Sequence, residues 1–146
     1  MIIKKKWSSK TYKKAANKHY QTCEQLINYF ESIREDAKPH IVSNIFYLSG
    51  YVLECILKSY LLELEHCTNE LTMEQLTIRG LKTHNVKELW DKIDHGIDKK
   101  SFNWTDISTK WEVYVRYDNS VITFQEVKQH FEETIKPIYV KIREQY

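Results

Sequence analysis

An apolar stretch of 24 residues, IVSNIFYLSGYVLECILKSYLLEL at 41–64, constrains this chain more than any other feature. Before its terminal Glu63 it holds two charged side chains, Glu54 and Lys58, and it contains one glycine and no proline. Most of its residues are good helix formers, and apolar side chains occupy nearly every side of the resulting helix. The stretch therefore predicts a central helix that neighbouring elements bury on several faces.

Glu54 and Lys58 are four residues apart, so they share one face of this helix in the favourable acid-before-base order. On an exposed helix such a pair contributes only about 0.2–0.5 kcal/mol. Within an apolar run, however, each charge is costly to bury unless it is paired or hydrated. We therefore expect the two side chains to face each other, another partner group or a wet groove.

The central stretch is also long enough to cross a membrane, but Glu54 and Lys58 would each cost about 2.5–3.5 kcal/mol at mid-helix. A buried core helix accommodates the same residues without this penalty, so we predict no membrane partner. The N-terminal MIIKKKW is not followed by the apolar region of a secretory signal. Three cysteines without a CxxC pair are typical of core residues in a reducing compartment, so we expect a cytoplasmic protein.

A length of 146 residues suits a single domain spanning 1–146. Only three glycines and two prolines are present, which leaves little material for hairpin turns and favours long helices. The predicted fold class is therefore all-α. A net charge of +2 is too small to indicate nucleic-acid binding by itself. The short basic runs KKKW and KTYKK near the N-terminus are compatible with RNA contact or with solvated ends.

Apolar residues spaced by three and four predict a first helix over residues 8–34, with Ser8 or Ser9 as its N-cap. The polar EDAK segment and Pro39 should end this helix and let the central one begin, which gives an antiparallel helical hairpin. The segment LTMEQL predicts a short helical turn that Gly80 breaks.

Asn85, with Glu88 three residues later, predicts the start of a short third helix, and Gly96 is a suitable stop. Residues 111–117 alternate in polarity, which predicts an extended segment lying across the helices. Thr123 and Glu126 form a capping box for a final helix. Pro137 should kink that helix, or end and restart it.

Three stretches resemble the HEPN superfamily (higher eukaryotes and prokaryotes nucleotide-binding domain). YLSGYVLECILKSYLL at 47–62 is similar to the family's second helix, where a Glu is followed four residues later by a Lys. THNVKEL at 83–89 resembles the Thr-His-Asp-Leu-x-x-Leu that opens the third helix, with Asn85 and Val86 as departures. VRYD at 115–118 resembles an Arg-Tyr pair before the last helix in one branch of the family. The resemblance covers about residues 9–145.

This resemblance implies a four- to five-helix up-and-down bundle, a homodimer, and a setting in bacterial toxin–antitoxin or phage-defence modules. Many members are metal-independent ribonucleases with an Arg-x(4–6)-His motif, in which His acts on the ribose 2′-OH and Arg stabilises charge on the phosphate. Other members lack that motif and are thought to bind a nucleotide or a partner protein such as a nucleotidyltransferase. The chain has to be assigned to one of these two groups.

Arg79 and His84 have the nuclease spacing. Histidine is a residue type whose pKa is ordinarily near neutral, so His84 would be the base, and Arg79 would be the fixed cation. Against a catalytic role, Gly80 follows the Arg where active members usually carry a polar residue. His84 is also explained as the His that opens the third helix. Arg116, the alternative cation, either makes a local ion pair in its loop or binds an anion. His130 lies too far along the chain for the motif, and Glu126 and Glu133 beside it predict a solvated residue.

Our leading hypothesis is a HEPN-domain protein that binds a nucleotide, RNA or a partner protein, without robust catalysis of its own. The rivals are a ribonuclease toxin that uses Arg79 and His84 (or Arg116), and a purely structural interaction domain. No HExxH, CxxC or glycine-rich phosphate loop occurs, so we predict neither a metal nor a cofactor. The candidate binding groove is formed by Tyr51, Glu54, Lys58, His84, Arg116, Tyr117 and Asp118.

Overall fold

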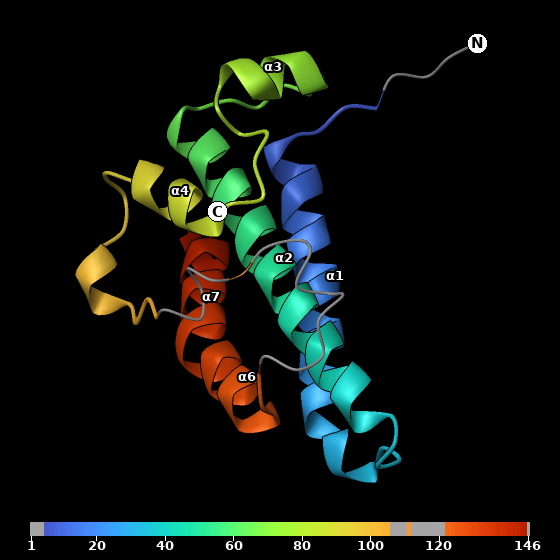
Figure 1. The fold of residues 1–146 in the computed structure, drawn as a ribbon. Helices are drawn as coiled ribbons and strands as arrows, with labels where there is room; N and C mark the ends of the chain where they lie inside the picture. The colour runs from blue at the N-terminus through green and yellow to red at the C-terminus, as the bar shows by residue number, and fades with distance from the viewer. Residues whose placement is uncertain (1–4, 106–110, 112–121, 146) are drawn as a thin grey trace.

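A computed structural model describes residues 5–105, 111 and 122–145 of the chain (Figure 1). All regular elements in these ranges are helical, and their one β-type pairing is an isolated bridge between Trp7 and Leu71. The predicted all-α class is therefore confirmed for this part of the chain.

The first helix, α1 (Ser9–Asn28), has Ser8 as its N-cap, one of the two predicted candidates. Ser8 and Thr11 form a capping box, in which the Ser8 hydroxyl accepts from the Thr11 N–H and the Thr11 hydroxyl accepts from the Ser8 N–H. The helix ends earlier than residue 34, and the short 3₁₀ helix η1 (Phe30–Ser32) follows it.

The central helix, α2 (Lys38–Leu64), begins three residues earlier than predicted. Pro39 lies inside its first turn instead of before it, which is tolerated because the first N–H groups of a helix have no intrahelical acceptor. The two long helices pack side by side as an antiparallel hairpin, as expected (Figure 1). Among the described residues, α2 is long and apolar enough to cross a membrane, but other elements bury 83% of its apolar window. The core helix of a soluble protein meets the same criterion.

A cluster of hydrogen bonds joins the start of α1 to the end of α2. The Ser9 hydroxyl donates to Glu63 Oε1 at 2.6 Å and lies 3.0 Å from the Ser59 hydroxyl. Since buried hydroxyls need hydrogen-bond partners, this cluster fixes the register of the two helices.

Two short helices follow α2, and the chain at the start of the second one contacts the middle of α2. Helix α3 (Met73–Ile78) has a Thr72 capping box, and Gly80 ends the segment at φ +73°, a conformation that favours glycine. Helix α4 (Val86–Lys92) begins at the predicted N-cap Asn85, whose side chain accepts from the Glu88 N–H. It ends at Lys92, earlier than the predicted stop at Gly96, and the 3₁₀ helix η2 (Lys99–Ser101) follows.

The C-terminal helical segment consists of α6 (Phe124–His130), the π-helical η4 (Phe131–Ile135) and α7 (Lys136–Gln145). The capping box of Thr123 and Glu126 is confirmed. Pro137 lies in the first turn of α7, directly after the π-helical turn, so the regular α-helical pattern is interrupted where we predicted. A proline cannot donate to the carbonyl four residues earlier, which accounts for the irregular turn at this point.

His130 corrects one prediction, because it is buried at 2% exposure instead of solvated. Glu126 and Glu133, which suggested a solvated face, do not share the inward-facing side of the helix that places His130 against Phe46. Burial lowers the pKa of the His130 imidazole to about 4, so it is neutral at pH 7. All three cysteines are free and buried, in line with their predicted core role.

Trp111 lies against the middle of α2. Its indole N–H donates to the Tyr47 carbonyl at 3.1 Å, and its ring occupies the space above Gly50. A Cβ on Gly50 would lie 1.8 Å from the indole, so this glycine is required by close approach. The remainder of the predicted extended segment, residues 112–117, lies outside the described residues.

Candidate functional site

The centre of the site is the Glu54 carboxylate, whose side chain is 6% exposed although it is an acid. One oxygen, Oε2, accepts a hydrogen bond from Lys58 Nζ at 3.2 Å. The other oxygen, Oε1, lies 2.7 Å from His84 Nδ1, and a proton on Nδ1 makes the imidazole the donor. Both expectations for this acid are therefore met, because it faces Lys58 and a second partner.

The Lys58 ammonium is equally buried and lies 5.6 Å from the centre of the Tyr12 ring, within range of a cation–π interaction. Burial, followed by the nearby Cys55 and Glu54, raises the pKa of the Tyr12 hydroxyl far above its usual value. Tyr12 therefore stays neutral at all physiological pH values and offers this site a hydroxyl and a ring face.

His84 comes from the loop that precedes α4, and its side chain is 60% exposed. The Asn85 cap fixes the backbone directly after it, which holds the imidazole over Glu54. The two stretches that carry most of the family resemblance, 47–62 and 83–89, thus contact each other through Glu54 and His84.

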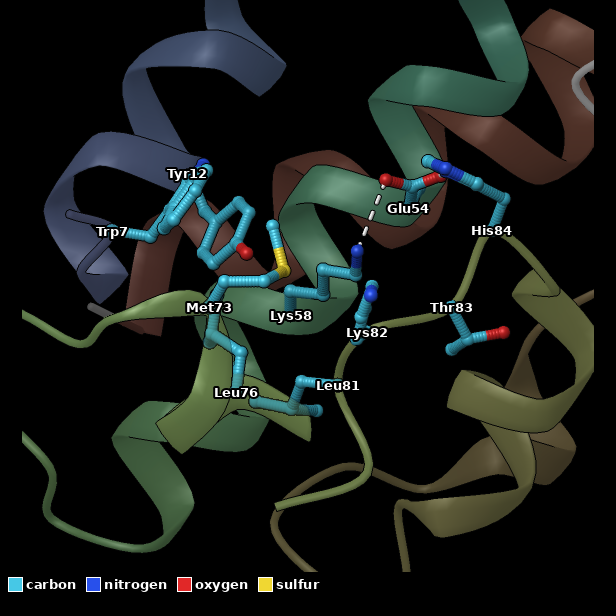
Figure 2. A pocket seen from close by; sticks show the side chains of 10 residues that line it. All are labelled: Trp7, Tyr12, Glu54, Lys58, Met73, Leu76, Leu81, Lys82, Thr83 and His84. Atoms are coloured by element: carbon cyan, nitrogen blue, oxygen red, sulfur yellow. Dashed lines mark hydrogen bonds and ion pairs between the residues drawn. The ribbon is translucent and has the colours of Figure 1, made fainter. Parts of the chain in front are cut away.

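These residues line a pocket of about 310 Å³ beside α2 (Figure 2). One part of its wall is apolar and comes from the N-terminal segment, α1, α3 and the following loop: Trp7, Tyr12, Met73, Leu76 and Leu81. The other part is polar: Glu54, Lys58, Lys82, Thr83 and His84. A concave site with a mainly apolar wall and a few convergent polar groups is typical of small-molecule binding.

Tyr51, another predicted groove residue, lies beside His84 in an aromatic cluster and is not one of the residues that line this pocket. Its ring meets the His84 ring edge-on at 6.2 Å and the Trp111 ring at 5.2 Å. Its hydroxyl accepts from the Tyr47 hydroxyl at 3.1 Å. His19 lies 5.8 Å away, and burial, with a contribution from the charge of Lys18, lowers the pKa of its imidazole.

Arg79 is bound elsewhere, in an ion pair with Glu65 just after the end of α2. Glu65 follows Glu54 by eleven residues, which corresponds to about 16 Å of helix. The described residues thus connect His84 and Arg79 to different carboxylates, and Arg79 does not line the pocket that His84 lines. Arg116, Tyr117 and Asp118, the other predicted groove residues, lie outside the described residues.

Trp7 and Lys82 line the pocket but were not predicted. The Trp7 N–H donates to the Leu71 carbonyl at 2.8 Å, and this long-range pairing brings the N-terminal segment beside α3. A single tryptophan before an N-cap gives no sequence signal for such a contact. Lys82 lies one residue before the THNVKEL stretch, so its position next to His84 could have been inferred. Among the residues described, no group of three or more His, Cys, Asp or Glu side chains could hold a metal.

No protein-family model matches the chain, and neither curated proteins nor solved structures show significant similarity to it. The geometry of this site and the residues that form it are therefore the basis on which a function can be inferred.

Proposed function

We propose that this chain is a HEPN-like helical bundle that binds a nucleotide in the pocket beside α2, without robust catalysis of its own. The observation that carries the proposal is the convergence of Glu54, Lys58 and His84 on a pocket with an aromatic wall. The up-and-down arrangement, the homodimer and the toxin–antitoxin or phage-defence setting belong to the same proposal and derive from the sequence resemblance.

The chemistry of the wall suits a ligand that is partly aromatic and partly anionic. Trp7 and Tyr12 offer ring faces on which a base can stack, an interaction worth about 1–3 kcal/mol. Two ammonium groups, from Lys58 and Lys82, outnumber the single carboxylate of the lining, so an anion is favoured over a cation. A volume of about 310 Å³ lies at the lower end of ligand pockets, which fits a mononucleotide better than a polymer.

The same geometry argues against the ribonuclease alternative with Arg79 and His84. Catalysis on a ribose 2′-OH needs the base and the phosphate-stabilising cation within reach of one scissile group. His84 is bound to Glu54 and Arg79 to Glu65, about 16 Å further along α2. The cation beside the imidazole is Lys58, and the same carboxylate already holds it.

Calorimetric titration with adenosine and guanosine nucleotides tests the proposal. Lys82→Gln removes an exposed pocket cation without disturbing the core, and Lys100→Gln is the matched control on the exposed η2 turn. We expect Lys82→Gln to weaken binding of nucleotides about tenfold, the value of one charge-assisted hydrogen bond, and to leave binding of the matching nucleosides unchanged. Trp7→Leu should weaken the binding of both the nucleotides and the matching nucleosides. Nucleotide binding that neither substitution alters would reject this pocket.

Two further results decide between the alternatives. Cleavage of a labelled RNA in EDTA that is lost in His84→Ala would favour the ribonuclease. The structural-domain alternative requires that no nucleotide raises the melting temperature, whereas a ligand at 100 times its Kd stabilises by about 2.7 kcal/mol. Protection that is reduced in Lys82→Gln would instead exclude a purely structural role.

A further inference from the structure

Charge is unevenly distributed along this chain. The first 23 residues contain seven lysines and no Asp or Glu, and the remainder has 15 Lys and Arg against 20 Asp and Glu. The N-terminal part therefore carries +7 and the rest −5, although the whole chain is close to neutral. A charge asymmetry of this size is typical of chains that contact polyanions, which the total of +2 does not indicate.

Three of these lysines form a row on the solvent side of α1, which Figure 1 shows at the edge of the bundle. Lys10, Lys14 and Lys18 are exposed and follow each other at intervals of four residues, so the row is about 12 Å long. Within the described part of the chain none of the three pairs with a carboxylate. We call these three residues the lysine row.

The lysine row lies where it does not help α1 to fold. Lys10 is the second residue of the helix, and the first turn contains no acid while the last turn contains no base. The helix macrodipole favours the opposite arrangement, with acids at the start and bases at the end. Capping by Ser8 and packing on α2 maintain the helix, so the lysines call for an explanation other than stability.

A polar surface continues the lysine row toward the C-terminal half of α1. An open hollow of about 550 Å³ is lined by Lys14, Asn17, Lys18, Gln21, Thr22, Gln25 and Leu26. Apart from Leu26, these side chains carry ammonium, amide or hydroxyl groups, which are the side-chain donors used to contact phosphate oxygens. The apolar side chains of α1, such as Tyr12, Ala16 and Cys23, are buried in the core.

We infer that the lysine row is a docking surface for the phosphate backbone of a nucleic acid, separate from the pocket beside α2. Evenly spaced cations suit a polymer with regularly repeated phosphates. Among the described residues that line this surface, the side chains offer ammonium and amide donors and include no aromatic ring for base reading. A membrane surface would need an apolar face that can insert between lipids, and α1 has buried that face. Binding is therefore independent of base sequence and strongly dependent on salt.

The test measures binding of the full chain to a fluorescent 20-nucleotide single-stranded RNA of mixed sequence by anisotropy, from 50 to 200 mM salt. The variant is Lys10→Gln/Lys14→Gln/Lys18→Gln, and the matched control, Lys100→Gln/Lys136→Gln/Lys141→Gln, removes three exposed lysines elsewhere. With three phosphate contacts, the affinity of the unmodified chain and of the control should fall at least tenfold across this range. The lysine-row variant should lose most of this dependence and bind at least tenfold more weakly at 50 mM salt.

Loss of binding through unfolding is distinguished by thermal melting. Removing bases from the start of α1 should leave the melting temperature unchanged or slightly higher, since the macrodipole disfavours them there. Three outcomes would each overturn the inference. They are equal RNA binding by the two triple variants, RNA binding that does not depend on salt, and tighter binding to phosphatidylserine vesicles than to RNA. Lys82→Gln, which tests the pocket, should bind this RNA like the unmodified chain, so the two proposals can fail separately.

Discussion

Two ion pairs, one in the middle of α2 and one just beyond its end, use the same chemistry in different surroundings. Glu54 and Lys58 lie in its middle, and each of these side chains is 6% exposed. Glu65, just after the end of the helix, pairs with Arg79, and these side chains are 49% and 35% exposed. The central pair connects two positions one turn apart on one helix, whereas the terminal pair connects α2 to the end of α3.

The difference shows that burial, and not contact alone, decides how removal of one partner of an ion pair changes the stability of the fold. An exposed pair contributes about 0–1 kcal/mol, because water and salt screen it. A buried pair has lost the hydration of both charges, and removing one partner leaves the other uncompensated. The central pair is therefore a poor source of stability and a sensitive point of the fold, which suits residues retained for binding.

The largest effect should come from breaking the central pair. Glu54→Leu leaves the Lys58 ammonium buried without its carboxylate, so we expect a loss of about 3–5 kcal/mol in the free energy of unfolding. Glu54→Leu/Lys58→Met removes both charges and should recover most of that loss. Urea denaturation measures both values, with Glu65→Leu as the control at the exposed end. A double variant as unstable as the single one would mean that the pair itself stabilises the fold.

His130 extends the comparison to a second polar group buried against the middle of α2, where its ring meets Phe46. Its pKa of about 4 in the folded state lies below the ordinary value of 6.5, so between these values the unfolded chain binds more protons. Stability from this group is present above pH 6.5 and is lost as the pH falls toward 4, by about 3 kcal/mol in total.

Urea denaturation at pH 7 and pH 4, carried out on the unmodified chain and on His130→Gln, measures this loss of stability. The carboxylates titrate equally in both proteins, so the difference between their losses is due to His130. We expect the unmodified chain to lose about 3 kcal/mol more between the two pH values than the variant does. Equal losses would show that His130 is protonated in the folded protein or becomes hydrated there.

Gly50 tests the packing of the same central region without any charge. In Gly50→Ala the new methyl group would overlap the Trp111 indole, so either the indole moves or α2 does. Overpacking of this kind costs about 1–3 kcal/mol. Near-ultraviolet circular dichroism should lose part of its tryptophan signal, and urea denaturation should show the loss of stability. Ala16→Gly, a change of similar size inside α1, should lower stability without that spectral change.

The fold followed from the sequence where local signals were strong. Asn85 and Thr123 were identified as caps, and Ser8 as one of two candidates with Ser9, because a short polar side chain before an apolar repeat has few other uses. The boundaries at residue 34 and at Pro39 were less accurate, since proline fits the first turn of a helix as well as the residue before it. His130 was misassigned because acidic neighbours in sequence do not reveal which side of a helix faces the core.

The candidate site was predictable in part. Glu54 and Lys58 were identified because charges inside an apolar helix require partners, and the resemblance pointed to His84 as one of them. Trp7 could not be predicted, because its place in the pocket depends on a backbone pairing with Leu71, 64 residues later in the chain. Arg79 shows the converse, since the motif spacing alone does not tell that its side chain pairs with Glu65 while His84 pairs with Glu54.

The smallest effect should come from the terminal pair. Arg79→Ala removes an exposed ion pair, so the free energy of unfolding should fall by less than about 1 kcal/mol, and less at 1 M salt than at 0.1 M. It should leave nucleotide affinity unchanged, because the Glu65 partner lies about 16 Å along α2 from the carboxylate that holds His84. His84→Ala should instead weaken nucleotide binding with a similarly small change in stability. If Arg79→Ala weakened binding as much as His84→Ala, the middle and the C-terminal end of α2 would form one site and the ribonuclease alternative would regain its catalytic pair.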